Sequence, residues 1–103
     1  MNTDTQPDLD INAVFRRLRA FDQSLIAGKA NKHDRAHMLI NACISEGIDT
    51  GTRITGALEK LGLNRQHVGI RLTEGIQNEP EWPNWGRRDD GTYYAPPRPT
   101  PDV

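Results

Sequence analysis

The sequence predicts a mainly α-helical fold that carries one small β-hairpin. Three observations predict it: apolar residues recur at helical spacing in four segments, Gly62 closes a short helix, and Asp90-Gly91 separates two segments that can pair as strands. The chain has 103 residues, enough for one hydrophobic core but not for two. We therefore expect one domain over residues 8–95, with a polar flexible tail at 1–7 and a proline-rich flexible tail at 96–103.

The first predicted helix covers residues 10–27. Asp8 or Asp10 can cap its start, and Gly28 ends it. One face is a continuous apolar stripe, which either completes the core of its own subunit or forms the interface of a homodimer. The residues of this stripe that would make a dimer interface are Ile11, Val14, Phe15, Leu18, Phe21 and Leu25, with Ile26 at its end.

The second predicted helix starts near Asn31, which can act as its N-cap, and runs to Glu46 before Gly47 stops it. Its apolar residues go most of the way round the helix, which is typical of a helix at the centre of a domain. Cys43 lies among them, so we expect a small buried residue there.

Two short helices follow across a tight turn. The first covers Thr52–Leu61, with Gly62 as a left-handed terminator, and the second runs from the cap residue Asn64 to about Gln77. At 100° per residue, Val68, Leu72, Gly75 and Ile76 share the side that faces the core. The opposite side then carries Gln66, Ile70 and Thr73.

The last predicted element is a hairpin over Glu81–Ala95. Asp90-Gly91 favours a type I′ turn, because both residues tolerate left-handed backbone conformations. Four aromatic residues flank this turn, and their expected role is to pack the hairpin onto the domain. They are Trp82, Trp85, Tyr93 and Tyr94.

This order of elements resembles the winged helix-turn-helix domain of bacterial and phage transcription regulators. In the match, Arg35–Ser45 is the first helix, Gly47–Thr50 a short extended link, Thr52–Leu61 the second helix, Asn64–Gln77 the recognition helix and Glu81–Ala95 the wing. The resemblance implies a fold that binds specific double-stranded DNA, with the recognition helix in the major groove.

The exposed side of the recognition helix has the chemistry for reading bases. Gln66 can pair with an adenine edge, and Ile70 or Thr73 can meet a thymine methyl group. Helix starts and arginines can hold phosphates, and arginines in a wing suit a narrow minor groove. The expected DNA-contacting residues are Thr52, Arg53, Asn64, Arg65, Gln66, His67, Ile70, Arg71, Thr73, Arg87 and Arg88.

The charge distribution limits the expected affinity for DNA. The net charge is -1, and from Gly51 to Gly91 six basic residues balance six acidic ones. Since cations supply most non-specific affinity for DNA, we expect modest, salt-sensitive binding unless two copies bind together. Asp89 and Asp90 at the wing tip either serve the turn or direct the wing toward a protein.

Other chemistries lack their motifs. His33 and His37 have the i, i+4 spacing of metal ligands, but the catalytic glutamate and a third ligand at a telling spacing are missing. No phosphate-binding glycine loop or nucleophile motif occurs. We therefore expect no enzyme activity, no cofactor and no metal.

The sequence also favours a cytoplasmic protein, because it has a single cysteine, no apolar run that could span a bilayer and no secretory signal. Taken together, these observations predict a homodimeric protein that binds a specific site on double-stranded DNA and represses or otherwise regulates transcription by occupying that site. Nothing in the chain resembles an effector-binding domain, so control would come from its concentration or from a partner. One alternative is a protein-interaction module, such as a phage-type inhibitor that uses a winged fold. Another is an accessory factor of plasmid or phage replication or partition.

Overall fold

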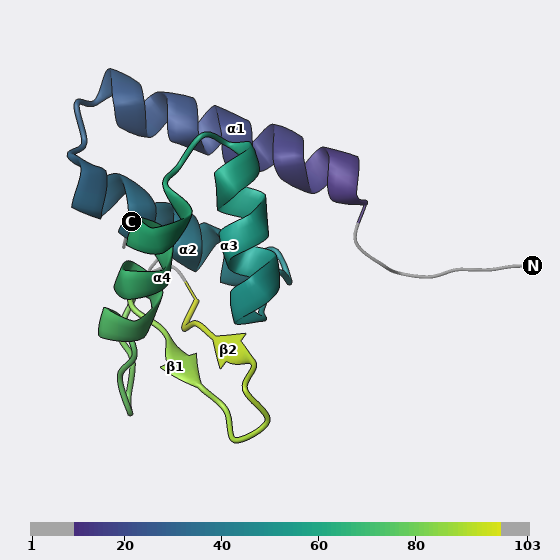
Figure 1. The fold of residues 1–103 in the computed structure, drawn as a ribbon, viewed down its shortest axis with the longest axis vertical. Coiled ribbons are helices and arrows are strands. Elements are labelled where there is room, and N and C mark those ends of the chain that lie inside the picture. Colours follow the sequence, from purple (N-terminus) through teal and green to yellow (C-terminus); the bar gives the residue numbers. More distant parts are fainter. Residues whose placement is uncertain (1–9, 98–103) are drawn as a thin grey trace, which may run out of the picture.

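A computed structural model describes residues 10–97 and confirms a mainly helical fold with one small hairpin (Figure 1). α1 lies across one end of the molecule, and the hairpin lies at the other end (Figure 1). The predicted tail at 1–7 and all but two residues of the predicted tail at 96–103 lie outside the described residues. The elements are α1 (Ile11–Ala27), α2 (Lys32–Ser45), α3 (Gly51–Lys60), α4 (Arg65–Glu74), β1 (Gly86–Arg87) and β2 (Tyr93–Tyr94).

Side-chain caps begin all four of these helices. Asp10 accepts hydrogen bonds from the backbone N–H groups of the first turn of α1, and Asn31 and Asn64 do the same for α2 and α4. These three caps were predicted. Thr50 caps α3, accepting from the N–H of Arg53 at 3.3 Å, and α3 therefore begins at Gly51, one residue earlier than predicted.

Left-handed residues follow three of the helices. Gly47 and Gly62 have φ angles of 96° and 98°, which glycine adopts without steric cost, so the predicted stops after α2 and α3 are confirmed. After α1, Gly28 is the C-cap as predicted, but its φ is -81° and Lys29 takes the left-handed conformation instead.

The core is built around α2, which packs against α1, α3 and α4 as its apolar circumference predicted. Cys43 is fully buried, and burial raises the pKa of its thiol to about 12, so it stays protonated at neutral pH. Among residues 10–97, no helix has the length and apolar character needed to cross a bilayer. The largest fully buried side chains are Trp85, Leu18, Leu39, Ile40, Ile54, Leu58, Val14 and Val68.

Two bidentate ion pairs attach α1 to α2. Arg17 donates to both carboxylate oxygens of Glu46 at 2.6 Å, and Arg35 donates to the buried Asp22 at 2.6 and 3.0 Å. The hydrogen bonds from Arg17 hold the pKa of the Glu46 carboxyl below its ordinary value. α1 is therefore fixed to the rest of the domain by charge as well as by apolar contact.

Trp85 anchors the segment between α4 and the hairpin. Its side chain is fully buried, and its indole N–H donates to the carbonyl of Leu72 at 2.8 Å. The ring lies 4.5 Å from that of His37, whose Nε2 is 2.9 Å from Oδ1 of Asn84. The expected packing role of this tryptophan is confirmed.

The position of Trp85 also explains why α4 is shorter than predicted. The helix ends at Glu74 and not near Gln77, because the N–H of Gln77 donates to the carbonyl of Trp85 at 2.8 Å. The backbone after Gly75 therefore pairs with the segment before β1 and leaves the helix. Gly75 lies against the indole, where a methyl group would overlap the ring.

The hairpin pairs Gly86 with Tyr94 and Arg87 with Tyr93. The predicted type I′ turn is wrong, because only Gly91 has a positive φ, at 91°, and a type I′ turn needs two such residues. The N–H of Gly91 donates to Arg88 O, and the N–H of Arg88 donates to Thr92 O. This pattern is that of a three-residue loop that closes on a left-handed glycine.

The hairpin is tied to the helices through the link between α2 and α3. The N–H of Tyr93 donates to the carbonyl of Asp49 at 2.8 Å, and the Tyr93 side chain is buried in the core. β2 thus lies beside residues 47–50, the link that the sequence predicted to be extended.

We predict opposite effects for alanine at two glycines of this region. Gly75→Ala should lower the free energy of unfolding by about 1–3 kcal/mol, because the new methyl group must displace a buried indole. Gly69→Ala should raise it by about 0.5–1 kcal/mol, because no atom lies within 4 Å of the new Cβ and alanine favours a helix. Urea unfolding of both variants measures the difference, and equal effects would contradict the packing described.

We also predict that His37 makes the fold sensitive to mild acid. Burial lowers the pKa of His37 below its ordinary value of 6.5, so the unfolded chain takes up a proton more readily than the folded chain. The stability that this residue contributes is present above pH 6.5 and is lost as the pH falls toward the folded-state pKa. Urea unfolding between pH 7 and 5 should show this loss, and His37→Gln should reduce it. An unchanged pH dependence in the variant would contradict the role of His37.

Candidate nucleic-acid interface

α4 presents the two faces that its sequence predicted. Val68 and Leu72 are buried in the core, whereas Gln66, Ile70 and Thr73 are exposed. Ile70 retains 51% of its accessible surface, the most of any large apolar residue among residues 10–97. The outer face of α4 therefore combines one amide, one hydroxyl and one apolar side chain that has no packing role in the domain.

The two arginines of α4 are both ion-paired. Arg65 donates to Glu59 of α3 at 3.1 Å, and both side chains are more than half exposed. Arg71 donates to Glu74 at 2.6 Å and retains only 22% of its side-chain accessible surface. Exposed pairs of this kind contribute about 0–1 kcal/mol, so a phosphate can compete with Glu59 for Arg65. Arg71 is the less accessible of the two.

A hollow of about 340 Å³ lies beside the first turn of α4. Asn64, one of its lining residues, uses its side-chain oxygen to accept the N–H of His67 at 2.9 Å, so this oxygen serves as a cap. The His67 ring lies 5.0 Å from that of His33, and its Nε2 is buried without a hydrogen-bond partner among residues 10–97. The lining residues are Lys32, Arg35, Gly62, Leu63, Asn64 and His67.

Lys32 is a residue of this hollow that sequence reasoning missed. It lies in the first turn of α2, far from α4 along the chain, and only the packing of α2 against α4 brings the two helix starts together. Helix starts present free N–H groups and a partial positive charge, which together with a lysine favour anions. A weak signal was present in the sequence, since Asn31 marked the start of α2.

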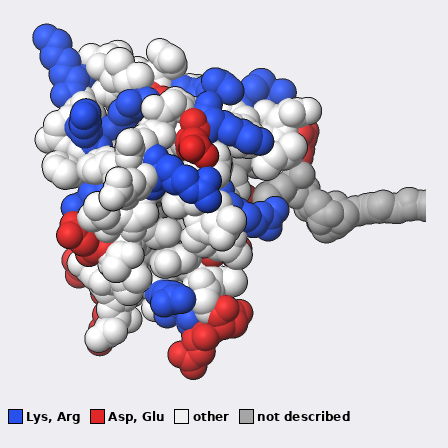
Figure 2. Space-filling model, in the orientation of Figure 1, with Lys and Arg blue, Asp and Glu red and all other residues white. Residues whose placement is uncertain are grey.

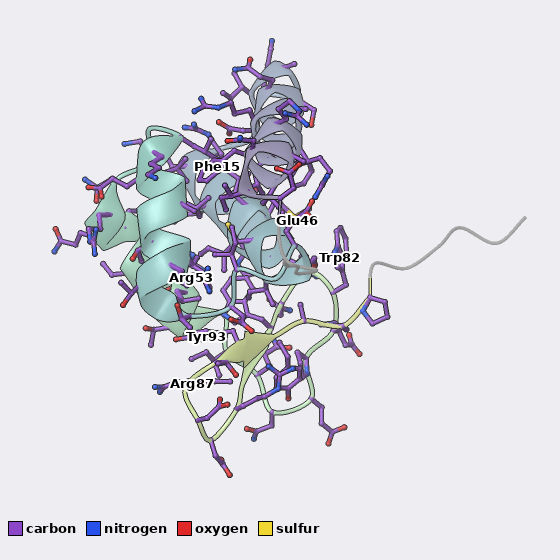
Figure 3. All side chains as sticks on the ribbon, turned by 90° about the vertical axis from the view of Figure 1, so that its right-hand side faces the viewer. Phe15, Glu46, Arg53, Trp82, Arg87 and Tyr93 are labelled. Atoms are coloured by element: carbon purple, nitrogen blue, oxygen red, sulfur yellow. The ribbon has the colours of Figure 1, made fainter. Side chains whose placement is uncertain are left out.

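The two arginines of the hairpin, Arg87 and Arg88, differ from one another. Arg87 is exposed and makes no ion pair or side-chain hydrogen bond within the described part of the chain, and Figure 3 shows it on the hairpin away from the helices. Arg88 instead donates to Thr92 Oγ1 and Tyr93 O, both at 3.2 Å, and lies 5.2 Å from the centre of the Tyr94 ring. Arg87 is therefore the hairpin cation that is free to reach a ligand.

The acidic tip of the hairpin has a structural role. Asp90 Oδ1 accepts hydrogen bonds from the N–H of Thr92 at 2.9 Å and from its hydroxyl at 2.7 Å. These bonds hold the pKa of Asp90 below its ordinary value, so it stays charged. The turn chemistry expected of this aspartate is present, and it leaves a negative charge at the tip.

Two residues that the sequence assigned to DNA remain, and both lie at the start of α3. Thr52 and Arg53 are both exposed. Arg53 lies with Ile11 and Phe15 along a hollow of about 240 Å³ between α1 and α3, so it belongs to the side of α3 that faces α1. The structure does not group it with the residues of α4.

The apolar stripe of α1 is used mainly inside the subunit. Val14 and Leu18 are each 1% exposed, and three further members pack half-buried against the core: Phe15, Phe21 and Leu25. Ile11 and Ile26, at the two ends of the helix, are 45% and 48% exposed. Of the two interpretations of the stripe, completion of the subunit core accounts for most of its residues. The exposed ends do not form a continuous apolar surface for a second copy.

The histidines that resembled metal ligands serve different contacts. His33 lies against His67, whereas His37 lies against Trp85. Among residues 10–97, no three histidine, cysteine, aspartate or glutamate side chains are grouped so that they could hold a metal ion.

Comparisons with protein-family models, with curated proteins and with solved structures found no match for this chain.

We predict that the two hairpin arginines differ in their effect on stability. Arg88→Ala should lower the free energy of unfolding by about 1 kcal/mol, because it removes two hydrogen bonds and a cation–π contact. Arg87→Ala should change it by less than about 0.5 kcal/mol, as expected of an exposed side chain without partners. Thermal or urea unfolding of the pair tests this assignment, and equal losses would show that Arg87 also supports the hairpin.

Proposed function

We propose that this chain is a winged helix-turn-helix protein that binds a specific site on double-stranded DNA through α4. The observation that carries the proposal is the outer face of α4, where Gln66, Ile70 and Thr73 are exposed beside a hollow that contains Lys32. An amide and apolar groups of this kind match the edges of A·T base pairs in the major groove.

The arrangement of the other elements supports this proposal. A helix, a short link, two helices across a tight turn and a hairpin follow in the order expected of a winged domain. The Tyr93–Asp49 hydrogen bond joins the second strand to the link after α2, so the wing is held to the same body as α4. A rigid connection between recognition helix and wing lets both contact one DNA duplex.

Phosphate contacts would come from groups around α4. Lys32 and the free N–H groups at the start of α4 lie together at one end of the helix, and Arg65 can exchange its exposed carboxylate partner for a phosphate. Arg87 supplies a cation on the wing. With so few available cations, binding depends on base contacts more than in a strongly basic domain, and occupation of the site would regulate transcription by blocking it.

A second candidate function is docking to a protein through the same face of α4. Two observations favour it: Ile70 is 51% exposed, and both arginines of α4 are already neutralised by glutamates. An exposed apolar residue in neutral surroundings is typical of a protein interface. The DNA experiment below separates the two candidates.

The test of DNA binding is selection of bound fragments from a random pool of double-stranded DNA, at low and at near-physiological salt. We expect an enriched motif at both salt concentrations. A motif with two-fold symmetry would also establish that two copies bind together. Failure to enrich a motif at either concentration would favour the protein-docking function.

The matched variants are Gln66→Ala and Gln23→Ala, which make the same chemical change on α4 and on the exposed side of α1. Gln66→Ala should weaken binding to the selected site by about 1–3 kcal/mol and leave binding to unrelated DNA nearly unchanged. Gln23→Ala should affect neither. Equal losses on both DNAs would refute a base-reading role for Gln66.

A further inference from the structure

A second surface, separate from the residues of α4, lies between α1 and α3. It begins as a hollow of about 550 Å³ lined by Ile11, Asn12, Phe15, Arg16, Arg19 and Lys60. The hollow of about 240 Å³ that contains Arg53 shares Ile11, Phe15 and Lys60 with it. We call the two together the α1–α3 groove. Figure 2 shows lysine and arginine side chains over α1 and α3, with acidic atoms visible among them.

The groove follows from the side chains on two helices. On α3, Arg53, Gly56, Ala57 and Lys60 have the spacing of one helical stripe, and this stripe lines the groove. Gly56 leaves open space, since no atom lies within 4 Å of the position that a Cβ would take. The sequence therefore builds a shallow wall of small residues with a cation at each end.

The floor of the groove is apolar. Ile11 is 45% exposed, and Phe15 is half-buried and projects from α1 toward α3 (Figure 3). The Nζ atom of Lys60 lies 5.7 Å from the centre of the Phe15 ring. An apolar floor with a cation above its aromatic ring suits a ligand that carries both apolar and acidic groups.

The charges on the groove are uncompensated. Arg17, Arg35, Arg65 and Arg71 each form an ion pair with a carboxylate. In contrast, the four cations of the groove form no ion pair within residues 10–97, and no aspartate or glutamate lines either hollow. They are Arg16, Arg19, Arg53 and Lys60. Four like charges around one depression repel one another, and a negatively charged ligand relieves that repulsion.

We infer that the α1–α3 groove docks an acidic amphipathic helix of a partner protein. Apolar side chains on one face of that helix would contact Ile11 and Phe15, and carboxylates beside them would pair with the surrounding cations. From Ile11 to Arg19 the groove follows α1 for about 12 Å at about 1.5 Å per residue, which matches two to three turns of a docked helix.

Two other occupants fit the groove less well. A DNA backbone offers phosphates but no apolar group to cover Ile11 and Phe15, so it satisfies only the charges. A second copy of this chain that docked symmetrically would bring the same four cations against themselves, which is unfavourable. An acidic amphipathic helix supplies apolar side chains for the floor of the groove and carboxylates for the cations around it.

The experiment is selection from a displayed library of random peptides of about 14 residues, which span about 21 Å as helices. Enriched peptides should carry several carboxylates and apolar residues at helical spacing. One enriched peptide is then synthesised and its Kd measured for three proteins: the unaltered chain, Arg16→Glu/Lys60→Glu, and Arg87→Glu as a charge reversal on the wing.

The double reversal should weaken peptide binding by about tenfold or more, a change of about 1.4 kcal/mol or more, and Arg87→Glu should leave it unchanged. All altered residues are exposed, so circular dichroism should show the same helical content in each variant. Ile11→Asp should also weaken binding, because it places a carboxylate on the apolar floor.

Three results would overturn the proposal. The first is a selection that enriches no acidic amphipathic peptide. The second is equal binding by a peptide that keeps its carboxylates but has serine at its apolar positions, which would show a general polyanion site. The third is loss of DNA binding in Arg16→Glu/Lys60→Glu, which would assign the groove to the DNA footprint. Gln66→Ala should leave peptide binding intact. Failure of the peptide to dock in the groove can therefore be distinguished from failure of α4 to read DNA bases.

Discussion

The burial of Trp85 is the constraint on which the rest of the structure depends. Its indole occupies the space between α2 and α4, and its one polar atom is satisfied by the carbonyl of Leu72. Burial of an aromatic ring of this size is among the largest apolar contributions available to a small domain. The backbone carbonyl of Trp85 also accepts the N–H of Gln77 just after α4, so this residue sets both the length of α4 and the position of the hairpin.

The cations of this molecule fall into two groups, those that are ion-paired within the domain and those that are not. Arg17 and Arg35 hold α1 on α2 through bidentate ion pairs, and the pairs at α4 neutralise much of the face that we propose for DNA. The cations of the α1–α3 groove have no such partners within the described part of the chain. The net charge of -1 is therefore the sum of a neutral α4 face, an acidic hairpin tip and a basic groove.

Local patterns predicted much of the fold and part of the candidate site. The caps Asn31 and Asn64 and the stop at Gly62 were correct because each depends on a few neighbouring residues. The exposed side of α4, with Gln66 and Ile70, was also correct, because helical periodicity fixes which residues share a face. The predicted end of α4 was wrong, because it depends on the hydrogen bond from Gln77 to Trp85, which lies further along the chain. The predicted turn type was wrong, because Arg88 and Thr92 pair across a three-residue loop and only Gly91 has a positive φ.

The sequence by itself determined where the helices begin, which of their faces are apolar and that a hairpin follows them, because these properties are encoded within a few turns of chain. Only the tertiary structure decided which cations are free. Lys32 approaches α4, Arg53 turns toward α1 and Arg88 is bound within the hairpin. The physical reason is that the neighbours of a cation in space decide whether it is paired within the domain or free to bind a ligand. Those neighbours come from helices that are far apart in the sequence.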